Sequence, residues 1–186
     1  MNLPSSSILR KIIDLEWEMR GSVQASPEEE GAFRLLRWMT HSVLTEDLSV
    51  RLLGHLAQAR EKGRNGTTQK YARMEGAAPP MSDSPLIGRL ADLEQAWMQA
   101  VRRRYPLTFP GTGSQFRASL VAELETYPED YLEALYGFEA ASEKAGRNLV
   151  EERYEQLFQH LGYESILARE QRAFLDNQRC GRQCRS

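Results

Sequence analysis

The sequence predicts an all-α protein made of two tandem four-helix repeats and a C-terminal helix. Apolar residues recur at the three- and four-residue spacing of amphipathic helices, and no segment shows sustained alternation rich in β-branched residues. A half of about 80 residues buries only a modest core by itself. We therefore expect the repeats, about residues 8–76 and 84–162, to pack around a pseudo-two-fold axis.

The repeat is visible when the chain is aligned with itself at a shift of 83 residues. The triplet Gly-Arg-Asn at residues 63–65 then falls on the same triplet at residues 146–148. Between residues 33 and 71, 11 of 39 positions are identical, whereas chance would give about two or three. Upstream, Asp-Leu-Glu at residues 14–16 matches residues 92–94 at a shift of 78. The two halves therefore share one helical plan.

In the first half, apolar spacing and capping residues place four helices. The second helix is expected to begin at Ser26, an N-cap followed by Pro27, and the third near Thr45. Gly63 is expected to end the third helix in the left-handed conformation, and Asn65 to cap the fourth. The first helix carries an apolar stripe formed by Ile8, Ile12, Leu15, Met19 and Val23.

The second half repeats these signals. Ser84 followed by Pro85 is expected to start the fifth helix, and the basic run at residues 102–104 is typical of a helix C-terminus. The sixth helix is expected to start near Ser114, the seventh near Pro128, and the eighth after residues 146–148. A ninth helix is expected from about Ser165 to Asn177. We expect one domain over residues 1–178 and a flexible tail over residues 179–186.

Composition excludes several classes of protein. The formal net charge is −2, without the basic excess that duplex nucleic-acid binding needs, so we expect no nucleic-acid partner. No run approaches the 18 apolar residues of a membrane span, and the N-terminus lacks a signal-peptide pattern. We therefore expect no membrane partner and a cytoplasmic location.

Cofactor and metal motifs are not found in the sequence. It contains no GxGxxG, no phosphate-binding loop and no HExxH. No histidine follows a glutamate at the spacing of a di-iron bundle. Cys180 and Cys184 have no second cluster to complete a zinc site, and a frayed end is the simpler interpretation than a redox pair. We expect no cofactor and no metal.

Two glutamates lie at equivalent places on apolar stripes. Glu16 lies among the apolar residues of the first helix and Glu94 among those of the fifth. A buried carboxylate must be paired or hydrogen-bonded, and the duplicated Arg64 and Arg147 are candidate partners. Either the pairs fix the first helix of each half structurally, or they face a ligand between the halves. Paired acids such as Glu123 with Glu125 are expected on solvated faces or in first helical turns.

Differences between the halves indicate where a specialised site would lie. Arg37 and His41, one turn apart, align with leucines in the second half. They could be solvent-facing residues near a helix C-terminus, or Arg37 could contact an anion in a pocket with Trp17 and Tyr71 as flat walls. In that pocket Glu16 would accept a proton and His41 would exchange one. The predicted site residues are Glu16, Trp17, Arg37, His41, Arg64, Tyr71, Glu94, Arg147 and Tyr154.

Several fragments together resemble a known family. They are "IIDLEWEM", "GRNGTTQKYARM", "RRYP", "FRASLVAELETY", "GRNLVEE" and "LGYESI", and they span about residues 8–168. In order and spacing they are similar to the uncharacterised bacterial family catalogued as domain of unknown function 4125. The family pattern falls here on residues 16–17, 63–65, 70–74 and 105–106. This chain departs from it between the first two helices and after Arg37. The resemblance implies no established reaction.

Two functions remain open from the sequence. The first is a small-molecule-binding protein or a cofactor-independent enzyme whose anionic or aromatic ligand lies between the repeats. The second is a non-catalytic helical interaction or regulatory module in which the repeated polar residues serve the fold. A cavity lined by the predicted site residues favours the first, and an exposed apolar patch favours the second.

Overall fold

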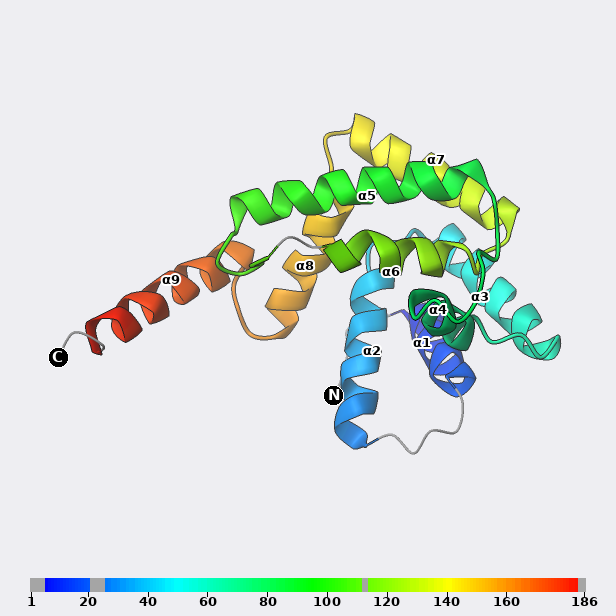
Figure 1. The fold of residues 1–186 in the computed structure, drawn as a ribbon, viewed down its shortest axis with the longest axis horizontal. Coiled ribbons are helices and arrows are strands. Elements are labelled where there is room, and N and C mark those ends of the chain that lie inside the picture. The colour runs from blue at the N-terminus through cyan, green and yellow to red at the C-terminus, as the bar shows by residue number, and fades with distance from the viewer. Residues whose placement is uncertain (1–5, 21–25, 112–113, 184–186) are drawn as a thin grey trace.

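A computed structural model describes residues 6–20, 26–111 and 114–183, with side chains described for 6–20, 26–111 and 115–178. These residues form nine α-helices and no strand, which confirms the all-α class (Figure 1). Val23, Cys184 and the side chain of Cys180 lie outside the described part. The helices are α1 (Ser7–Met19), α2 (Pro27–His41), α3 (Glu46–Glu61), α4 (Gly66–Met74), α5 (Pro85–Arg104), α6 (Ser114–Leu124), α7 (Glu129–Lys144), α8 (Leu149–His160) and α9 (Ile166–Gln183).

The capping residues start the helices where the sequence predicts. The Ser26 hydroxyl accepts a hydrogen bond from the Glu29 backbone N–H, and the Glu29 carboxylate accepts one from the Ser26 N–H. This reciprocal pair is a capping box, and Pro27 occupies the first helical position. The Thr45 hydroxyl caps α3, and Ser84 caps α5 ahead of its proline. These predicted starts are confirmed.

The repeated triplet ends one helix and starts the next in both halves. Gly63 has φ 65° and Gly146 has φ 74°, the left-handed conformation that disfavours a Cβ. The side-chain oxygens of Asn65 and Asn148 cap α4 and α8. Each asparagine also donates through Nδ2 to a backbone carbonyl near the C-terminal part of the half's first helix, at Met19 or Trp97. The asparagine therefore fixes the fourth helix of each half against the first.

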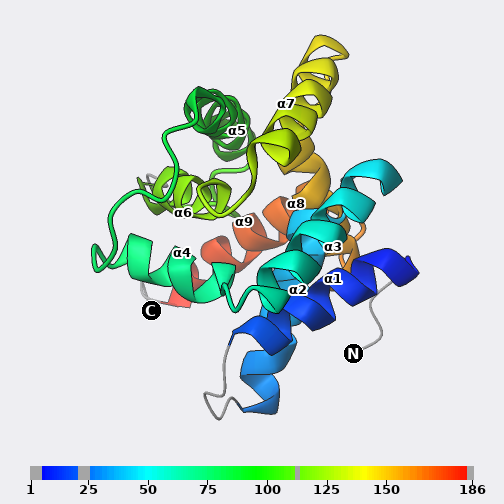
Figure 2. The same cartoon turned by 90° about the vertical axis from the view of Figure 1, so that its right-hand side faces the viewer.

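The contacts between helices follow one plan. In the first half α1 packs against α2, α3 and α4, and in the second half α5 packs against α6, α7 and α8. Across the halves α3 packs on α7, α4 on α6 and α2 on α8 (Figure 2). A two-fold exchange of the halves would generate this set of pairings. The pseudo-two-fold axis itself stays a prediction that these pairings support.

The main core lies where the two halves meet. The helices α1, α3, α5 and α7 each contribute an almost completely buried residue to it, and α6 adds Leu124. The residues from the first four are Ile12, Leu52, Leu90 and Leu132. Because α1, α3, α5 and α7 form most of the shared core, α2, α4, α6 and α8 are left to surround the space beside it, where the candidate site lies.

The last helix differs from its prediction. It begins after Ser165, whose hydroxyl accepts from the Ala168 N–H, but it continues to Gln183 rather than ending near Asn177. Residues 179–183, expected to be part of a tail, therefore belong to α9. Figure 1 shows α9 projecting away from the other helices toward the C-terminus. Within the described ranges, no helix is both long and apolar enough to cross a membrane.

Candidate functional site

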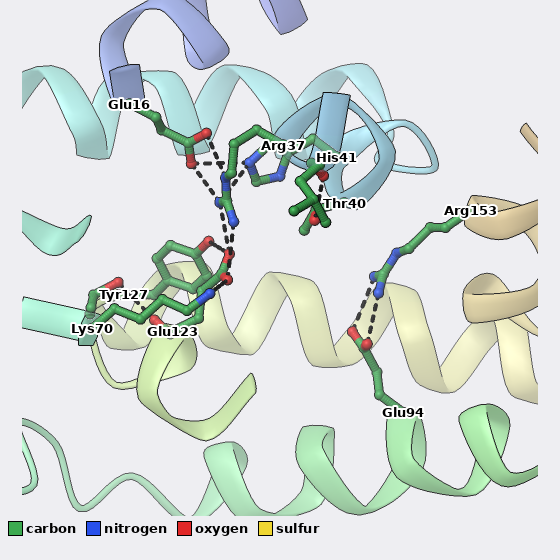
Figure 3. A network of polar contacts seen from close by, with 11 residues as sticks. Glu16, Arg37, Thr40, His41, Lys70, Glu94, Glu123, Tyr127 and Arg153 are labelled. Atoms are coloured by element: carbon green, nitrogen blue, oxygen red, sulfur yellow. Dashed lines mark hydrogen bonds and ion pairs between the residues drawn. The ribbon is translucent and has the colours of Figure 1, made fainter. Parts of the chain in front are cut away.

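A cavity of about 490 Å³ lies between the two halves. Six helices each contribute one charged side chain to its lining, three of them positive and three negative. The six are Glu16 from α1, Arg37 from α2, Lys70 from α4, Glu94 from α5, Glu123 from α6 and Arg153 from α8. Figure 3 shows these side chains as two separate groups. We call them the Arg37 cluster (Glu16, Arg37, His41, Lys70, Glu123, Tyr127) and the Arg153 cluster (Glu94, Glu139, Arg153).

In the Arg37 cluster one guanidinium is held between two carboxylates. Arg37 donates through Nε and Nη2 to Glu16 at 2.8 and 2.6 Å, and through Nη1 and Nη2 to Glu123 at 3.1 and 2.8 Å. Such bidentate pairs are the strongest form of charge-assisted hydrogen bond. The arginine side chain is 14% exposed. Arg37 therefore ties α1 to α6, across the two halves, from its position on α2.

Glu123 has two further partners. Lys70 Nζ lies 2.7 Å from one carboxylate oxygen, and the Tyr127 hydroxyl donates to the other at 2.9 Å. Two carboxylates and two cations thus balance in this cluster. Burial raises the pKa of the Tyr127 hydroxyl, and the nearby charge of Glu123 adds to the effect. Tyr127 is therefore a stable neutral donor.

The carboxylates of the Arg37 cluster are ionised. Burial raises the pKa of Glu16, but the charges of Arg37 and His41 and their hydrogen bonds outweigh burial and lower it to about 2. The same opposition, with Arg37 and Lys70 as the cations, holds the pKa of Glu123 well below its usual value. A carboxylate with so low a pKa is a weak proton acceptor at neutral pH. This geometry does not favour the predicted role of Glu16 as a base.

His41 supports the cluster from behind the cavity. Its Nε2 lies 2.9 Å from Arg37 Nη2 and 3.1 Å from Glu16 Oε1, and the residue is buried. With a lone pair at Nε2 the ring accepts from Arg37, and with a proton there it donates to Glu16. The ring does not line the cavity; it borders a second hollow beside Ser49 and Gln156.

The Arg153 cluster has one cation for two carboxyl groups. Arg153 donates through Nη1 and Nη2 to Glu94 at 2.7 and 3.1 Å, while its Nη2 lies 3.9 Å from an oxygen of Glu139. Glu139 is completely buried on α7. Burial and the neighbouring Glu94 raise the pKa of Glu139 well above its usual value, and Arg153 offsets this only in part. This environment therefore favours the protonated, uncharged form of Glu139.

The rest of the cavity wall is mainly apolar and aromatic. Tyr71 and Tyr154, the aromatic residues that follow the two triplets, both line it. Phe33 also lines it, and the Trp17 ring supports Phe33 from outside at a centroid distance of 5.3 Å. Further apolar lining comes from Met19, Leu36, Met39, Leu56, Met74, Phe116, Leu120 and Val150.

A comparison with protein families now identifies the chain's relatives. The model of the family described as "Protein of unknown function (DUF4125)" matches residues 6–171. The chain belongs to the DUF4125 family. The matched residues include all six charged residues of the cavity lining. The resemblance noted in the sequence is thus confirmed. No curated protein and no solved structure matches this DUF4125 member.

The predicted site residues divide into two sets. Five line the cavity of this DUF4125 member, namely Glu16, Arg37, Tyr71, Glu94 and Tyr154. His41 and Trp17 contact lining residues without lining the cavity themselves. Arg64 and Arg147 are exposed and do not belong to the lining. The interpretation of Arg37 and His41 as solvent-facing residues is wrong, since the first is largely and the second fully buried.

The predicted partners of the buried glutamates are wrong. Glu16 pairs with Arg37 rather than Arg64, and Glu94 pairs with Arg153 rather than Arg147. Arg147 instead pairs with Glu152 on the surface, 2.7 Å away. The physical reason is direction, because the triplet arginine lies in an exposed turn between helices and points away from the core.

The sequence reasoning also missed several residues of the site. Glu123 and Glu125 do not lie on a solvated face: Glu123 pairs with Arg37, and the buried Glu125 pairs with Arg73 at 2.9 Å. Lys70 and Arg153 carried a usable signal, because they align with each other at the shift of 83 and both are cations. Glu139 aligns with the buried Leu56, so an acid replacing a core leucine was a second signal.

The lining provides no evident metal site. Among the residues whose side chains are described, no group of three or more histidine, cysteine, aspartate or glutamate side chains is arranged to hold a metal ion. The carboxylates of the lining are instead arranged around arginine and lysine. The chemistry that the cavity offers is therefore that of ion pairs and aromatic surfaces.

Proposed function

We propose that this DUF4125 member binds a small organic molecule in the cavity between its halves. The observation that carries the proposal is the convergence of six charged side chains, from six helices of both halves, on one cavity of about 490 Å³. Burial of these charged side chains lowers the stability of the folded protein, and apolar side chains in the same place would not carry this cost. Cavities of this size, largely apolar with a few convergent polar groups, are typical of ligand sites.

The walls favour a ligand with an aromatic or otherwise apolar body. Phe33, Tyr71, Phe116 and Tyr154 offer ring surfaces from α2, α4, α6 and α8. Aromatic rings gain up to about 1.5 kcal/mol per pair beyond the area that they bury. Tyr71 is 48% exposed, so this side of the cavity is open to an entering molecule.

The charges set limits on how the ligand binds. Both edges of the Arg37 guanidinium already donate to carboxylates, so an anion that used Arg37 would have to displace Glu16 or Glu123. The role that the geometry supports for Glu16 and His41 is to hold Arg37 in place. Binding rather than proton transfer is thus the activity supported at the Arg37 cluster.

A second candidate function is an interaction or regulatory module. It is favoured by α9, which projects from the fold and leaves Leu167, Phe174 and Leu175 more than half exposed. The experiment below separates the two candidates, because a module that acts only through α9 has no reason to bind small molecules in the cavity.

The test is a thermal-shift comparison of the wild-type protein with a cavity-filling variant. The compounds are 2-phenylethylamine, 2-phenylethanol and 3-phenylpropionate, which share a ring and differ in charge. A compound at about tenfold its Kd adds about 1.4 kcal/mol of stability, which raises the Tm by about 3–6 °C for a protein of this size. Ser119→Trp places an indole in the cavity, since Ser119 lines it, and should abolish the shift.

The matched control for this variant is on the same helix. Ala118 is exposed and does not line the cavity, so Ala118→Trp adds the same side chain outside the cavity and should retain the full shift. Equal loss of the shift in both variants, or no shift with any compound, would contradict a ligand site in the cavity.

A further inference from the structure

The Arg153 cluster differs from the Arg37 cluster by one missing cation. In the Arg37 cluster, two carboxylates share Arg37, and Lys70 supplies a second positive charge 2.7 Å from Glu123. In the Arg153 cluster two carboxyl groups face a single guanidinium. Neither oxygen of Glu139 accepts a hydrogen bond from a described donor. Burial and the neighbouring Glu94 raise the pKa of this carboxyl group and so favour its protonated form.

No other described charge replaces that missing cation. The charged groups that act on Glu139 are Glu94 from α5 and Arg153 from α8. On α7 itself the neighbouring titratable group is the neutral Tyr131 hydroxyl, whose pKa is raised by burial. The third helix, which also packs on α7, contributes apolar residues such as Leu52 to the shared core. With one guanidinium facing two carboxyl groups, this cluster is electrically neutral when Glu139 holds a proton, the form that its raised pKa favours.

From this arrangement we infer that the Arg153 cluster binds a protonated amine of the ligand, which contacts Glu94 and takes the place that Lys70 holds in the Arg37 cluster, while Glu139 gives up its proton. The inference rests on the proposed function and names the charged group of that ligand. Glu94 lines the cavity, and each of its oxygens uses only one of its acceptor positions for Arg153. An ammonium group can therefore reach it without displacing the arginine.

Little movement is needed for Glu139 to lose its proton and pair with Arg153 when the ammonium group binds. Arg153 Nη2 lies 3.1 Å from Glu94 and 3.9 Å from Glu139, so a shift of under about one ångström gives the ionised Glu139 a hydrogen-bonded partner at ordinary distance. The proton released by Glu139 passes to the solvent, and the neighbouring Glu94 borders the cavity. Charge balances, since one positive charge enters as the ammonium and one leaves as the proton.

Binding of an anionic ligand would require the cluster to take up a proton rather than release one. The charge of that ligand in the cavity would have to be offset by a proton taken up, and the raised pKa of Glu139 favours a carboxyl group that already holds its proton. An aromatic amine should therefore bind more tightly than the corresponding alcohol, and the alcohol more tightly than the acid. Because amine binding releases one proton, its affinity should rise with pH by up to about tenfold per unit, until the pH reaches the pKa of Glu139 in the free protein.

Isothermal titration calorimetry tests this with three probes: 2-phenylethylamine, 2-phenylethanol and 3-phenylpropionate. The titrations are made at pH 5.5, 6.5 and 7.5, and at pH 7.5 in phosphate and in Tris to count protons. The matched variant is Glu139→Leu, since leucine occupies the aligned position 56 in the first half. We expect the wild-type protein to bind the amine tightest, with affinity that rises with pH and about one proton released. In the variant the pH dependence of amine binding and the proton release should vanish.

The contrary outcomes separate the two proposals. If the alcohol or the acid binds but the amine does not bind more tightly, the amine site is wrong and the cavity remains a ligand site. The same conclusion follows if amine affinity is independent of pH, or if Glu139→Leu leaves the proton release unchanged. If none of the three probes binds at any pH, both proposals are wrong.

Discussion

Arg37→Leu is expected to lower the free energy of unfolding by about 3–5 kcal/mol at pH 7. Leucine occupies position 120, which aligns with Arg37 in the second half, so the repeat already accommodates leucine at this place in its second helix. The cost arises because Glu16 and Glu123 would remain buried without the guanidinium that pairs with both. Urea unfolding monitored by circular dichroism gives the difference.

The control for Arg37→Leu is Arg147→Leu, the arginine for which the sequence alone predicted a buried partner. Arg147 is paired with Glu152 on the surface, and both side chains are substantially exposed. Exposed ion pairs contribute at most about 1 kcal/mol, so this variant should unfold close to the wild-type protein. Equal losses in the two variants would contradict the assignment of Arg37 as the residue that neutralises the buried acids.

The effect of Arg37→Leu should also depend on pH. The folded protein lowers the pKa of Glu16 to about 2 and lowers that of Glu123 as well. Groups with a lowered folded pKa contribute stability that is present above the unfolded pKa and is lost as the pH falls through the folded value. The difference between the wild-type protein and Arg37→Leu should therefore be full near pH 6 and shrink between about pH 4.5 and pH 2–3.

Glu139→Leu is expected to stabilise the protein at pH 7, by about 1–3 kcal/mol. The wild-type side chain is completely buried and accepts no hydrogen bond from a described donor. Its folded pKa is raised, so its contribution to stability is full below the unfolded pKa and is lost as the pH rises toward the folded value. Over that interval wild-type stability should fall by up to about 1.4 kcal/mol per pH unit from this group alone.

Two variants separate titration from burial at this position. Glu139→Gln removes the titration but keeps a buried polar group, so it should abolish the pH-dependent part without the full gain in stability. Glu139→Leu should abolish the pH-dependent part and gain the stability as well. Unfolding free energies at pH 5, 6, 7 and 8 measure both effects. Parallel stability curves for the wild-type protein and Glu139→Gln would contradict a raised pKa of Glu139 in the folded protein.

Local signals in the sequence predicted the fold well because each acts over a few residues. Ser26 and Thr45 cap their helices through hydrogen bonds to an amide three positions on, and Gly63 needs its left-handed backbone whatever packs nearby. Such interactions depend little on tertiary structure. The order of all nine helices in the described residues could therefore be predicted, whereas the end of α9 had no comparable stop signal.

The ion pairs could not be predicted in the same way, because a buried charge selects its partner from distant segments. Glu123 is separated from Arg37 by 86 residues and from Lys70 by 53. Identity between the repeats drew attention to Arg64 and Arg147, which have the same place in the turn and face solvent. The paired cations that form the site, Lys70 and Arg153, match in charge without being identical. An alignment of the two repeats that scored charge as well as identity would have indicated these two cations.

Methionine methyl groups provide the most direct test that a small molecule binds in the cavity. Met19, Met39 and Met74 line it, whereas Met98 is buried in a different part of the core and Met81 lies outside the lining. The measurement is a methyl NMR spectrum of the ¹³C-methionine-labelled protein, recorded while the phenyl compound that stabilises it most is added. We expect the resonances of Met19, Met39 and Met74 to shift together and saturably, while those of Met98 and Met81 stay in place. Unchanged cavity methyls, or shifts confined to Met98 or Met81, would contradict a ligand site between the halves.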